Sequence, residues 1–298
     1  MNMRRRDFLK LSAITAFSFK NGLIPSHIEA SQKTDLAVAR GADPSAITRA
    51  AIDALGGMKR FITKGDIVVV KPNIAWDRTP EQAANTNPEV VATIVQMCFE
   101  AGAKKVKVFD RTVNDPRRCY VQSGIEKAAR EKGAEVSYID SRRFKEVEIK
   151  GNVLKTWPLY IDILEADKII NVPIAKHHGL AKLTMAIKNW MGVMGGSRGN
   201  IHQRLDESLV DLASFIKPTL TVLDAVRILI RNGPQGGDLS DVKKLDTLIA
   251  GIDQVAVDSY GATLFGLKGE DLGYVKIAHS RGVGTMDLTK LNIKKISL

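Results

Sequence analysis

The stretch "DIVVVKPN", residues 66–73, decides the fold. Residues 67–70 form a run of β-branched side chains without polar alternation. Such a run is typical of a strand that is covered on both faces, as in a parallel sheet. Lys71 and Asn73 follow it, and the intervening proline favours extended backbone at Lys71. The stretch therefore predicts a buried strand that ends in polar side chains.

Segments with helical patterns alternate with further strands on either side of this stretch. "DPSAITRAAIDALGG" (43–57) and "NPEVVATIVQMCFEAGA" (87–103) each combine a capping residue, an early proline and a terminal glycine. A helix over 120–132 and strands in "KKVKVFD" (104–110) and "AEVSYI" (134–139) complete the rhythm. This β-α-β-α-β order over residues 60–140 predicts an α/β fold with a mostly parallel, helix-covered sheet.

The pattern changes after residue 141. "EVEIKGNVLKTW" (146–157) predicts a hairpin, and "ADKIINVP" (166–173), "PTLTVLDAVRILI" (218–230) and "LDTLIAGID" (245–253) predict strands. Helices are expected over 253–266 and 271–281. We expect a single α/β domain over residues 31–298, either continuous or with a small subdomain inserted after residue 141.

The N-terminal stretch "RRRDFLKLSAITAFSF" (4–19) resembles a twin-arginine export signal. Its uncharged run, Leu11 to Phe19, is too short to span a bilayer. We therefore predict that residues 1–30 are a signal segment read by the export machinery, that the protein is periplasmic or otherwise extracytoplasmic, and that it has no transmembrane span. Cleavage near residue 30 and retention of the segment both stay open, and a frayed basic helix is the alternative.

Composition restricts the ligands. The formal net charge of +11 favours anionic ligands, whereas scattered basic residues, three tryptophans and five tyrosines argue against a specific nucleic-acid partner. The two cysteines, Cys98 and Cys119, are too few for one chain to ligate a four-thiolate iron–sulfur cluster. Whether they pair in a disulfide is left open.

Polar side chains follow several of the predicted strands. Ligands bind outside the carboxyl ends of the strands in open parallel sheets, so these side chains are expected to converge. Asp110 could equally be a helix cap or a turn residue. The residues at strand ends are Lys71, Asn73, Asp110, Arg111, Lys176, His177, His178 and Asp224.

The segment "AKHHGLAKLTMAIKNWMGVMGG" (175–196) carries the densest signal. Apolar residues at spacings of three and four from Leu183 to Met194 predict a helix with one face on the core. Lys188 and Asn189 fall off that face, where they either are solvated or line a site. The glycines that follow would let backbone amides approach an anion.

Candidate roles follow from residue type. Histidines in this region can be metal ligands or acid–base groups, lysine and arginine can hold an anion, and carboxylates can orient or transfer protons. The later loop "RNGPQGGD" (231–238) lacks the spacing of a phosphate loop and is predicted to be a turn. The candidates are His178, Lys188, Asp110 and Asp224 for catalysis; Lys71, Asn73, Asn189, Gly195, Gly196 and Arg198 for cofactor or anion binding; and His177, His178 and His202 for a metal ion.

Four motifs together resemble the bacterial and archaeal family known as domain of unknown function 362. They lie between about residues 64 and 280 and are "VVVKPN", "PIAKHHGLAKLTMAIKNWMG", "LDAVRILIRNGPQGG" and "DQVAVDSYGATLFG". The resemblance implies an α/β fold but no established reaction. Some members are iron–sulfur-linked or bear twin-arginine leaders. Because this chain lacks cluster cysteines, a redox role would need another cofactor or an iron–sulfur partner protein.

A shorter segment is similar to lactate racemase-like proteins, which hold a nickel-pincer cofactor. The matching positions are His178, Lys188 and His202. The similarity implies that the lysine anchors a cofactor and that the histidines are ligands or acid–base groups. The double glycine that precedes the lysine in that family is replaced here by Ala186 and Ile187.

The leading functional hypothesis is an exported α/β enzyme that acts on a small anionic substrate. A metal ion or an anionic cofactor would support either proton transfer or a redox step, and the sequence does not choose between them. The alternatives are a non-catalytic protein that binds an anion or a metal, and an accessory subunit of an iron–sulfur enzyme.

Overall fold

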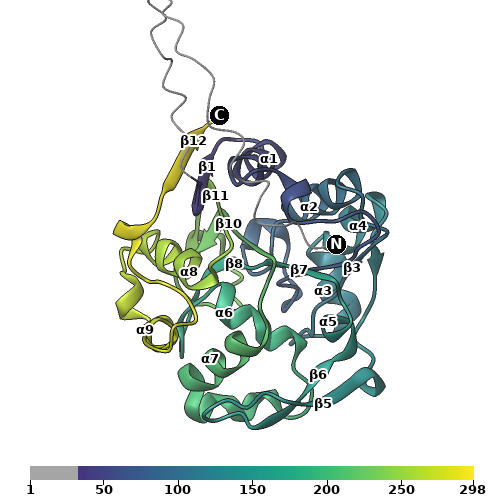
Figure 1. Ribbon diagram of the computed structural model, residues 1–298, viewed down its shortest axis with the longest axis vertical. Helices are drawn as coiled ribbons and strands as arrows, with labels where there is room; N and C mark the ends of the chain where they lie inside the picture. Colours follow the sequence, from purple (N-terminus) through teal and green to yellow (C-terminus); the bar gives the residue numbers. More distant parts are fainter. Residues whose placement is uncertain (1–32) are drawn as a thin grey trace, which may run out of the picture. The chain divides into compact units, whose positions relative to one another are not determined.

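A ten-stranded sheet, in which most neighbouring strands run parallel, forms the centre of the structure (Figure 1). The computed structural model describes residues 33–298, and the predicted signal segment lies outside this range. The main strand order is β12-β1-β11-β10-β7-β2-β3-β4, and β8 joins β10 and β9. The predicted α/β class with a mostly parallel sheet is confirmed.

The strand at residues 66–73 has the predicted surroundings. β2 lies between two parallel neighbours, with Val69 opposite Lys107 of β3 and Ile169 of β7. The strands of the large sheet are β1 Leu36–Arg40, β2 Ile67–Pro72, β3 Lys105–Val108, β4 Glu135–Val136, β7 Lys168–Val172, β8 Ile174–His178, β9 Lys182–Thr184, β10 Leu220–Leu229, β11 Val242–Gly251 and β12 Ile293–Ser297.

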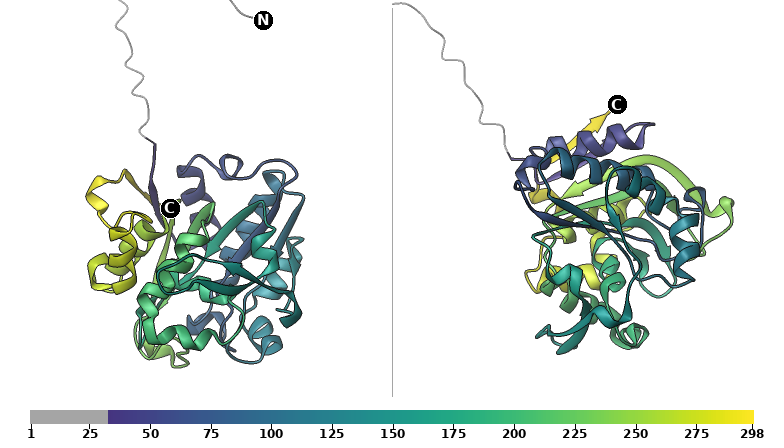
Figure 2. Two further views of the ribbon diagram at one scale, coloured as in Figure 1. Left: turned by 60° about the horizontal axis from the view of Figure 1, so that its bottom comes forward. Right: turned by 90° about the vertical axis from the view of Figure 1, so that its right-hand side faces the viewer.

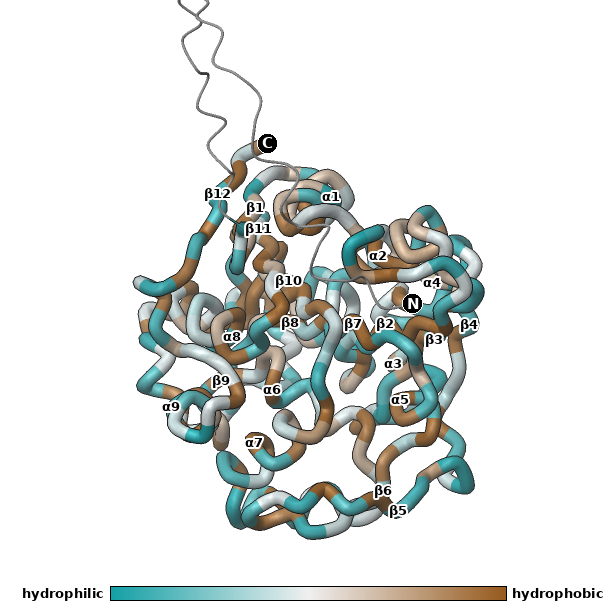
Figure 3. The backbone as a smooth tube through the Cα atoms, in the orientation of Figure 1, coloured by the Kyte–Doolittle hydropathy of each residue, from teal (hydrophilic) through white to brown (hydrophobic). Residues whose placement is uncertain are grey.

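Both faces of the sheet are buried. Val68 and Val70 pack into one hydrophobic core and Val69 packs into the other, because successive side chains of a strand point to opposite faces. Hydrophobic segments gather along the central strands around β10 in Figure 3. The valine run thus has no polar alternation because neither face meets water.

Helices flank the strands on both sides (Figure 2). The cores assign α1, α2 and α4 to one face and α6 to α9 to the other. The predicted caps form: Asp43 accepts from the backbone at the start of α1, and Asn87 does so at the start of α2. The helices are α1 Pro44–Ala54, α2 Pro88–Glu100, α3 Pro116–Gln122, α4 Ile125–Glu131, α5 Ile161–Leu164, α6 Ala186–Asn189, α7 Leu205–Phe215, α8 Gln254–Thr263 and α9 Gly273–Ser280.

Two predicted helices are wrong in extent. The helix over 120–132 is split into α3 and α4, because Gly124 adopts a left-handed φ of 70° that ends helical geometry. The helix expected from Leu183 is reduced to the four residues of α6 and a following 3₁₀ turn, Trp190–Val193. Leu183 itself pairs with His177 across β9 and β8, so strand pairing overrides the helical spacing there.

The hairpin near residue 150 is confirmed. β5 (Phe144–Glu148) and β6 (Thr156–Tyr160) pair antiparallel in a separate two-stranded sheet. Asp211 accepts hydrogen bonds from the amides of Asn152, Val153 and Leu154 and so fixes the connecting loop.

The end of the sheet nearest the termini of the described chain departs from the sequence reading. β1 and β12 were not predicted, and β11 runs antiparallel to both β1 and β10.

Asp224 lies within β10, not at its end. No helix in residues 33–298 is both long and apolar enough to cross a membrane.

Candidate functional site

A cavity of about 490 Å³ lies where the carboxyl ends of β2, β3 and β8 meet. Strand ends, α6 and the loop around residue 200 all contribute to its wall. The structure thus brings together eight of the predicted site residues: Lys71, Asn73, Asp110, His178, Lys188, Asn189, Arg198 and His202.

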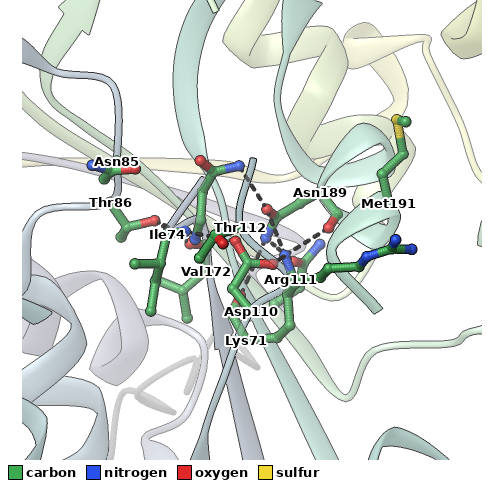
Figure 4. A network of polar contacts seen from close by, with 12 residues as sticks. Lys71, Ile74, Asn85, Thr86, Asp110, Arg111, Thr112, Val172, Asn189 and Met191 are labelled. Carbon is green, nitrogen blue, oxygen red and sulfur yellow. Dashed lines mark hydrogen bonds and ion pairs between the residues drawn. The ribbon is translucent and has the colours of Figure 1, made fainter. Parts of the chain in front are cut away.

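Lys71 and Asp110 form a buried ion pair at the base of the cavity (Figure 4). Nζ of Lys71 lies 2.8 Å from Oδ1 of Asp110, and Oδ2 of Asp110 accepts from the Ile74 amide at 2.6 Å. Burial lowers the pKa of Lys71, and the Asp110 charge opposes this change. Asp110 is the only acidic residue among the described residues that line the cavity. Because it pairs with Lys71, its negative charge is not available to the other cations of the wall.

Asn189 ties three parts of the chain together. Its Oδ1 accepts from Nζ of Lys71 at 2.9 Å and from Nδ2 of Asn73 at 3.1 Å. Its Nδ2 donates to the Lys71 carbonyl at 3.2 Å and to Oδ1 of Asn171 at 2.8 Å. All of its side-chain hydrogen-bonding capacity is therefore used inside the protein, so Asn189 positions the strand ends and α6.

Gly192 permits this close packing. A Cβ atom at residue 192 would lie 1.8 Å from Oδ1 of Asp110 and 2.4 Å from Nζ of Lys71. The Gly192 carbonyl also accepts from the Arg111 amide at 2.8 Å. The backbone after α6 can therefore cover the ion pair only if residue 192 lacks a side chain.

Lys176 is a second buried cation. Its Nζ donates to Oδ1 of Asn73 at 3.1 Å and to the carbonyl of Ala84. Burial, with the positive charge of Lys188 as the next cause, lowers the pKa of Lys176 to about 7. No carboxylate in the described chain forms an ion pair with it, so this amine has neutral acceptors alone.

The ammonium group of Lys188 has weaker hydrogen-bond acceptors than that of Lys176. Its side chain is buried, and the contact of its Nζ atom within residues 33–298 is Sδ of Met191 at 3.2 Å, a weak acceptor. Burial lowers the pKa of Lys188 to about 8, and the charge of Arg198 acts in the same direction. An amine of this kind faces the cavity without a strong partner.

Asp258 of α8 places Lys188, and the sequence reading missed it. Its carboxylate accepts from the amides of Ala186 at 2.6 Å and Ile187 at 3.0 Å, at the start of α6. Burial raises the pKa of Asp258 to about 7. Its position in the motif "DQVAVDSYGATLFG" was the available signal, but no local pattern links it to a helix about seventy residues away.

His178 is held as a neutral hydrogen-bond donor. Its Nδ1 accepts from the amides of Leu180 at 3.1 Å and Ala181 at 3.2 Å, so the proton of the neutral ring resides on Nε2. Burial lowers the pKa of His178 to about 3, with the charge of Lys188 as the next cause.

The predicted histidine ligands do not form a metal site together. His178 presents a protonated Nε2, which has no lone pair for a metal. His177 lines a different cavity, and its Nδ1 accepts from the Gly233 amide at 3.1 Å. His202 donates from Nδ1 to the Gly199 carbonyl at 2.8 Å and is left as one isolated ligand. Within residues 33–298, no group of three His, Cys, Asp or Glu side chains could hold a metal ion.

Two arginines brace the loops that border the cavity. Arg198 donates to the carbonyls of Arg111 and Thr112, each at 2.7 Å, and to that of Met191 at 3.2 Å. Arg111 donates to the carbonyls of Met194 and Gly196. Neither guanidinium forms an ion pair with a carboxylate of residues 33–298, so both add to the positive potential.

Besides His177, three of the predicted site residues lie away from the cavity: Asp224, Gly195 and Gly196. Both oxygens of Asp224 accept backbone amides, from Asn87 at 2.7 Å and Val226 at 2.9 Å, and burial raises its pKa to about 6. Gly195 and Gly196 pack against Pro158 of β6, and the Gly195 amide donates to the Pro158 carbonyl. The glycines that line the cavity are instead Gly179, Gly192, Gly199 and Gly233.

Other cavity residues were not among the predicted site residues. Thr184 has a buried hydroxyl with no hydrogen-bond partner in the described chain. Gly233 and Pro234, from the loop predicted to be only a turn, reach the cavity wall. Apolar side chains complete the wall: Trp76, Val113, Leu180 and Met191.

The two cysteines are free and buried. Cys98 lies in α2 and Cys119 in α3, and burial raises the pKa of both thiols, that of Cys119 to about 11. Their Sγ atoms are therefore protonated and poorly suited to metal ligation.

Residues 68–263 match the family described as a domain of unknown function (DUF362). The chain belongs to this family. The DUF362 match begins in β2 and ends in α8, so it includes every residue that lines the cavity as well as Asp258. The resemblance read from the four motifs is confirmed.

A thylakoid-associated protein of Synechocystis sp. is 30% identical to this DUF362 chain over 218 residues. The matched region is 70% of this chain and 66% of that protein, so the chain spans just under two thirds of its relative's length.

Similar solved structures include the lactate racemase apoprotein of Thermoanaerobacterium thermosaccharolyticum. The identity is 13%, the TM-score is 0.44, and the match covers 72% of this chain and 54% of that one. A Thermotoga maritima protein has 11% identity and a TM-score of 0.41, with coverage of 76% and 60%.

Proposed function

We propose that this DUF362 protein is an enzyme that binds a small organic anion in the cavity and transfers a proton on it. The observation that carries the proposal is the pair of buried lysines, Lys176 and Lys188, that line the cavity and have no carboxylate partner within residues 33–298. Buried charges are ordinarily paired, so an unpaired buried cation at a cavity wall calls for an anion from outside the protein.

The charge balance of the wall supports an anionic ligand. Lys71 is matched by Asp110, whereas the polar contacts of Lys176, Lys188 and Arg198 within the described part of the chain are with neutral groups. His178 and Thr184 add hydrogen-bond donors. A carboxylate or phosphate would find both charge and donors there, and the burial of Lys176 and Lys188 would strengthen the attraction.

The same lysines supply proton-transfer chemistry. General acid–base catalysis works best when the pKa of the group lies near the ambient pH, and burial brings the pKa of Lys176 to about 7 and that of Lys188 to about 8. Each amine can therefore lose and regain a proton near neutral pH. Because the histidines do not form a ligand set, we route no step through a metal ion.

Calorimetric titration with butyrate, a simple carboxylate, tests the anion site. We expect saturable binding by wild-type protein, and about tenfold or greater weakening in Lys188→Met and Lys176→Met, since each loses one cation. Lys127→Met is the control, because the Lys127 side chain is 84% exposed on α4. Equal affinity in all four proteins would contradict the site. Binding without turnover of any bound acid would favour the non-catalytic alternative.

We also propose that residues 1–30 direct export of the folded domain through the twin-arginine route. The support is the sequence pattern of Arg5, Arg6, Phe8 and Leu9 with the short apolar run that follows.

A further inference from the structure

We propose that Lys188 forms an imine with the carbonyl group of a small aldehyde or ketone that also bears a carboxylate. The inference deepens the proposed function, on which it rests, by naming the class of substrate and the atom that reacts with it.

The surroundings of Lys188 are those of an amine nucleophile. Lys188 lines the cavity, and its Nζ atom contacts Sδ of Met191 at 3.2 Å and has no oxygen partner within residues 33–298. Neighbouring cations and burial favour the neutral amine, and both are known means of activating a lysine toward carbonyl compounds. Lys71 differs in its partners, because three acceptors hold its Nζ: the Asn189 carbonyl, Asn189 Oδ1 and Asp110.

Position, as well as the lack of an oxygen acceptor within residues 33–298, separates Lys188 from Lys71 and Lys176. Asp258 accepts from the first two amides of α6. Asn189, the residue after Lys188, is hydrogen-bonded to β2 and β7, so the backbone on both sides of Lys188 is fixed. A nucleophile on a fixed backbone loses little freedom when it reacts. The carboxylate of the substrate would meet Lys176 and Arg198, which places the adjacent carbonyl next to Lys188.

The reaction balances without an oxidant or a metal. The lone pair of Nζ forms a bond to the carbonyl carbon, and the carbonyl oxygen takes up a proton to give a carbinolamine. The carbon–oxygen bond then breaks, and the oxygen leaves as water after it gains a second proton from the ammonium group of Lys176. Nζ loses two protons in forming the neutral imine: the first passes to the carbonyl oxygen in the carbinolamine, and the second returns to the amine of Lys176, so one water molecule is released for each imine formed.

The apolar part of the wall is consistent with a carbonyl compound. Val113 and Met191 line the cavity together with Trp76. These side chains can contact the carbon skeleton of a short acid.

Reduction with sodium borohydride in the presence of 2-oxobutyrate tests the proposal. Borohydride converts an imine to a stable secondary amine, which peptide mass spectrometry locates. We expect one dominant adduct, at Lys188, in the full-length protein and in the control Lys127→Met. The adduct should be lost in Lys188→Met, whose fold is checked by circular dichroism.

Competition by butyrate makes the test independent of the variant. Butyrate carries the same carboxylate and chain but no carbonyl, so an excess should lower the adduct at Lys188 about fivefold or more and leave surface lysines unchanged. Adducts spread over exposed lysines with none at Lys188 would overturn the inference. If butyrate still binds in that case, the anion site survives and only the imine fails. If neither acid binds, the proposed function fails as well.

Discussion

Nζ of Lys71 lies 2.8 Å from Oδ1 of Asp110, and both side chains are shielded from solvent. The one carboxylate among the described cavity residues is therefore paired with Lys71 and with no other lysine of the wall. The remaining cations of the wall are therefore left for an external anion. The ion pair is a structural element that also defines the chemistry of its neighbours.

Replacement of Asp110 by Asn should destabilise the protein strongly. Lys71 would remain buried as an unpaired charge, and breaking a buried pair costs about 3–5 kcal/mol of unfolding free energy. Urea denaturation measures the change. The double variant Lys71→Met/Asp110→Asn should recover part of the lost stability, because it removes the unpaired buried charge. A stability loss in the double variant equal to the summed losses of the two single variants would argue against the ion pair.

Gly192→Ala should disturb the same place by steric overlap. The new Cβ would fall 1.8 Å from Oδ1 of Asp110, so the backbone must shift, with an expected loss of about 1–3 kcal/mol in stability and weaker butyrate binding. Gly199→Ala is the matched control, because that glycine lines the same cavity and a Cβ there would meet nothing within 4 Å. Similar behaviour of the two variants would contradict the packing described.

Anion affinity should depend on pH through the two buried amines. Lys176 and Lys188 are cations below their pKa values of about 7 and about 8 and neutral above them. Butyrate should thus bind most tightly at about pH 6 and progressively less tightly toward about pH 9. The bound anion favours the charged amines, so the loss of affinity should occur at a somewhat higher pH than the pKa values of the free protein. Calorimetry across this range checks the trend. Lys188→Met should remove the part of the pH dependence near pH 8, which comes from Lys188. Affinity that is flat with pH would count against both lysines as anion ligands.

Asp258 should make stability fall as pH rises. Burial raises its pKa to about 7 in the folded protein from an ordinary value of 3.8. Between these values the folded state keeps a proton that the unfolded chain has released, so this contribution is complete at low pH and disappears as pH passes about 7. Urea denaturation at several pH values should show that the stability advantage of wild type over Asp258→Asn shrinks from about pH 4 to about pH 7. An advantage that grows over this range would reverse the assignment.

The export proposal is tested at Arg5 and Arg6. Conversion of both to Lys keeps the charge but removes the pattern of the signal, so the protein should accumulate in the cytoplasm of a bacterium that has the twin-arginine route. Fractionation with immunodetection provides the measurement. Lys10→Arg, which leaves the arginine pair intact, is the control, and an unchanged distribution of the double variant would refute the proposal.

Local patterns were sufficient where the structure is itself local or uniformly buried. The valine run of β2 identified a strand with two covered faces, and Asp43 and Asn87 marked the starts of α1 and α2. The arrival of Lys71, Asp110 and His178 at one cavity also followed from sequence, because parallel strands end at the same edge of a sheet.

Long-range contacts decided the rest. The spacing from Leu183 predicted a long helix, but pairing with β8 made that end a strand, and Asp258 fixed the start of the short α6. The tautomer of His178 is set by the amides of Leu180 and Ala181, which residue type alone does not reveal.

The sequence by itself determined the α/β class, the family, and which strand ends carry charged groups, because periodicity and strand direction are properties of the chain. Only the tertiary structure decided which charges are matched. Asp110 lies against Lys71, Asp258 lies against α6, and Lys188 is left facing the cavity. These pairings join residues far apart in the chain, and whether a buried charge is balanced depends on distances that no linear pattern contains.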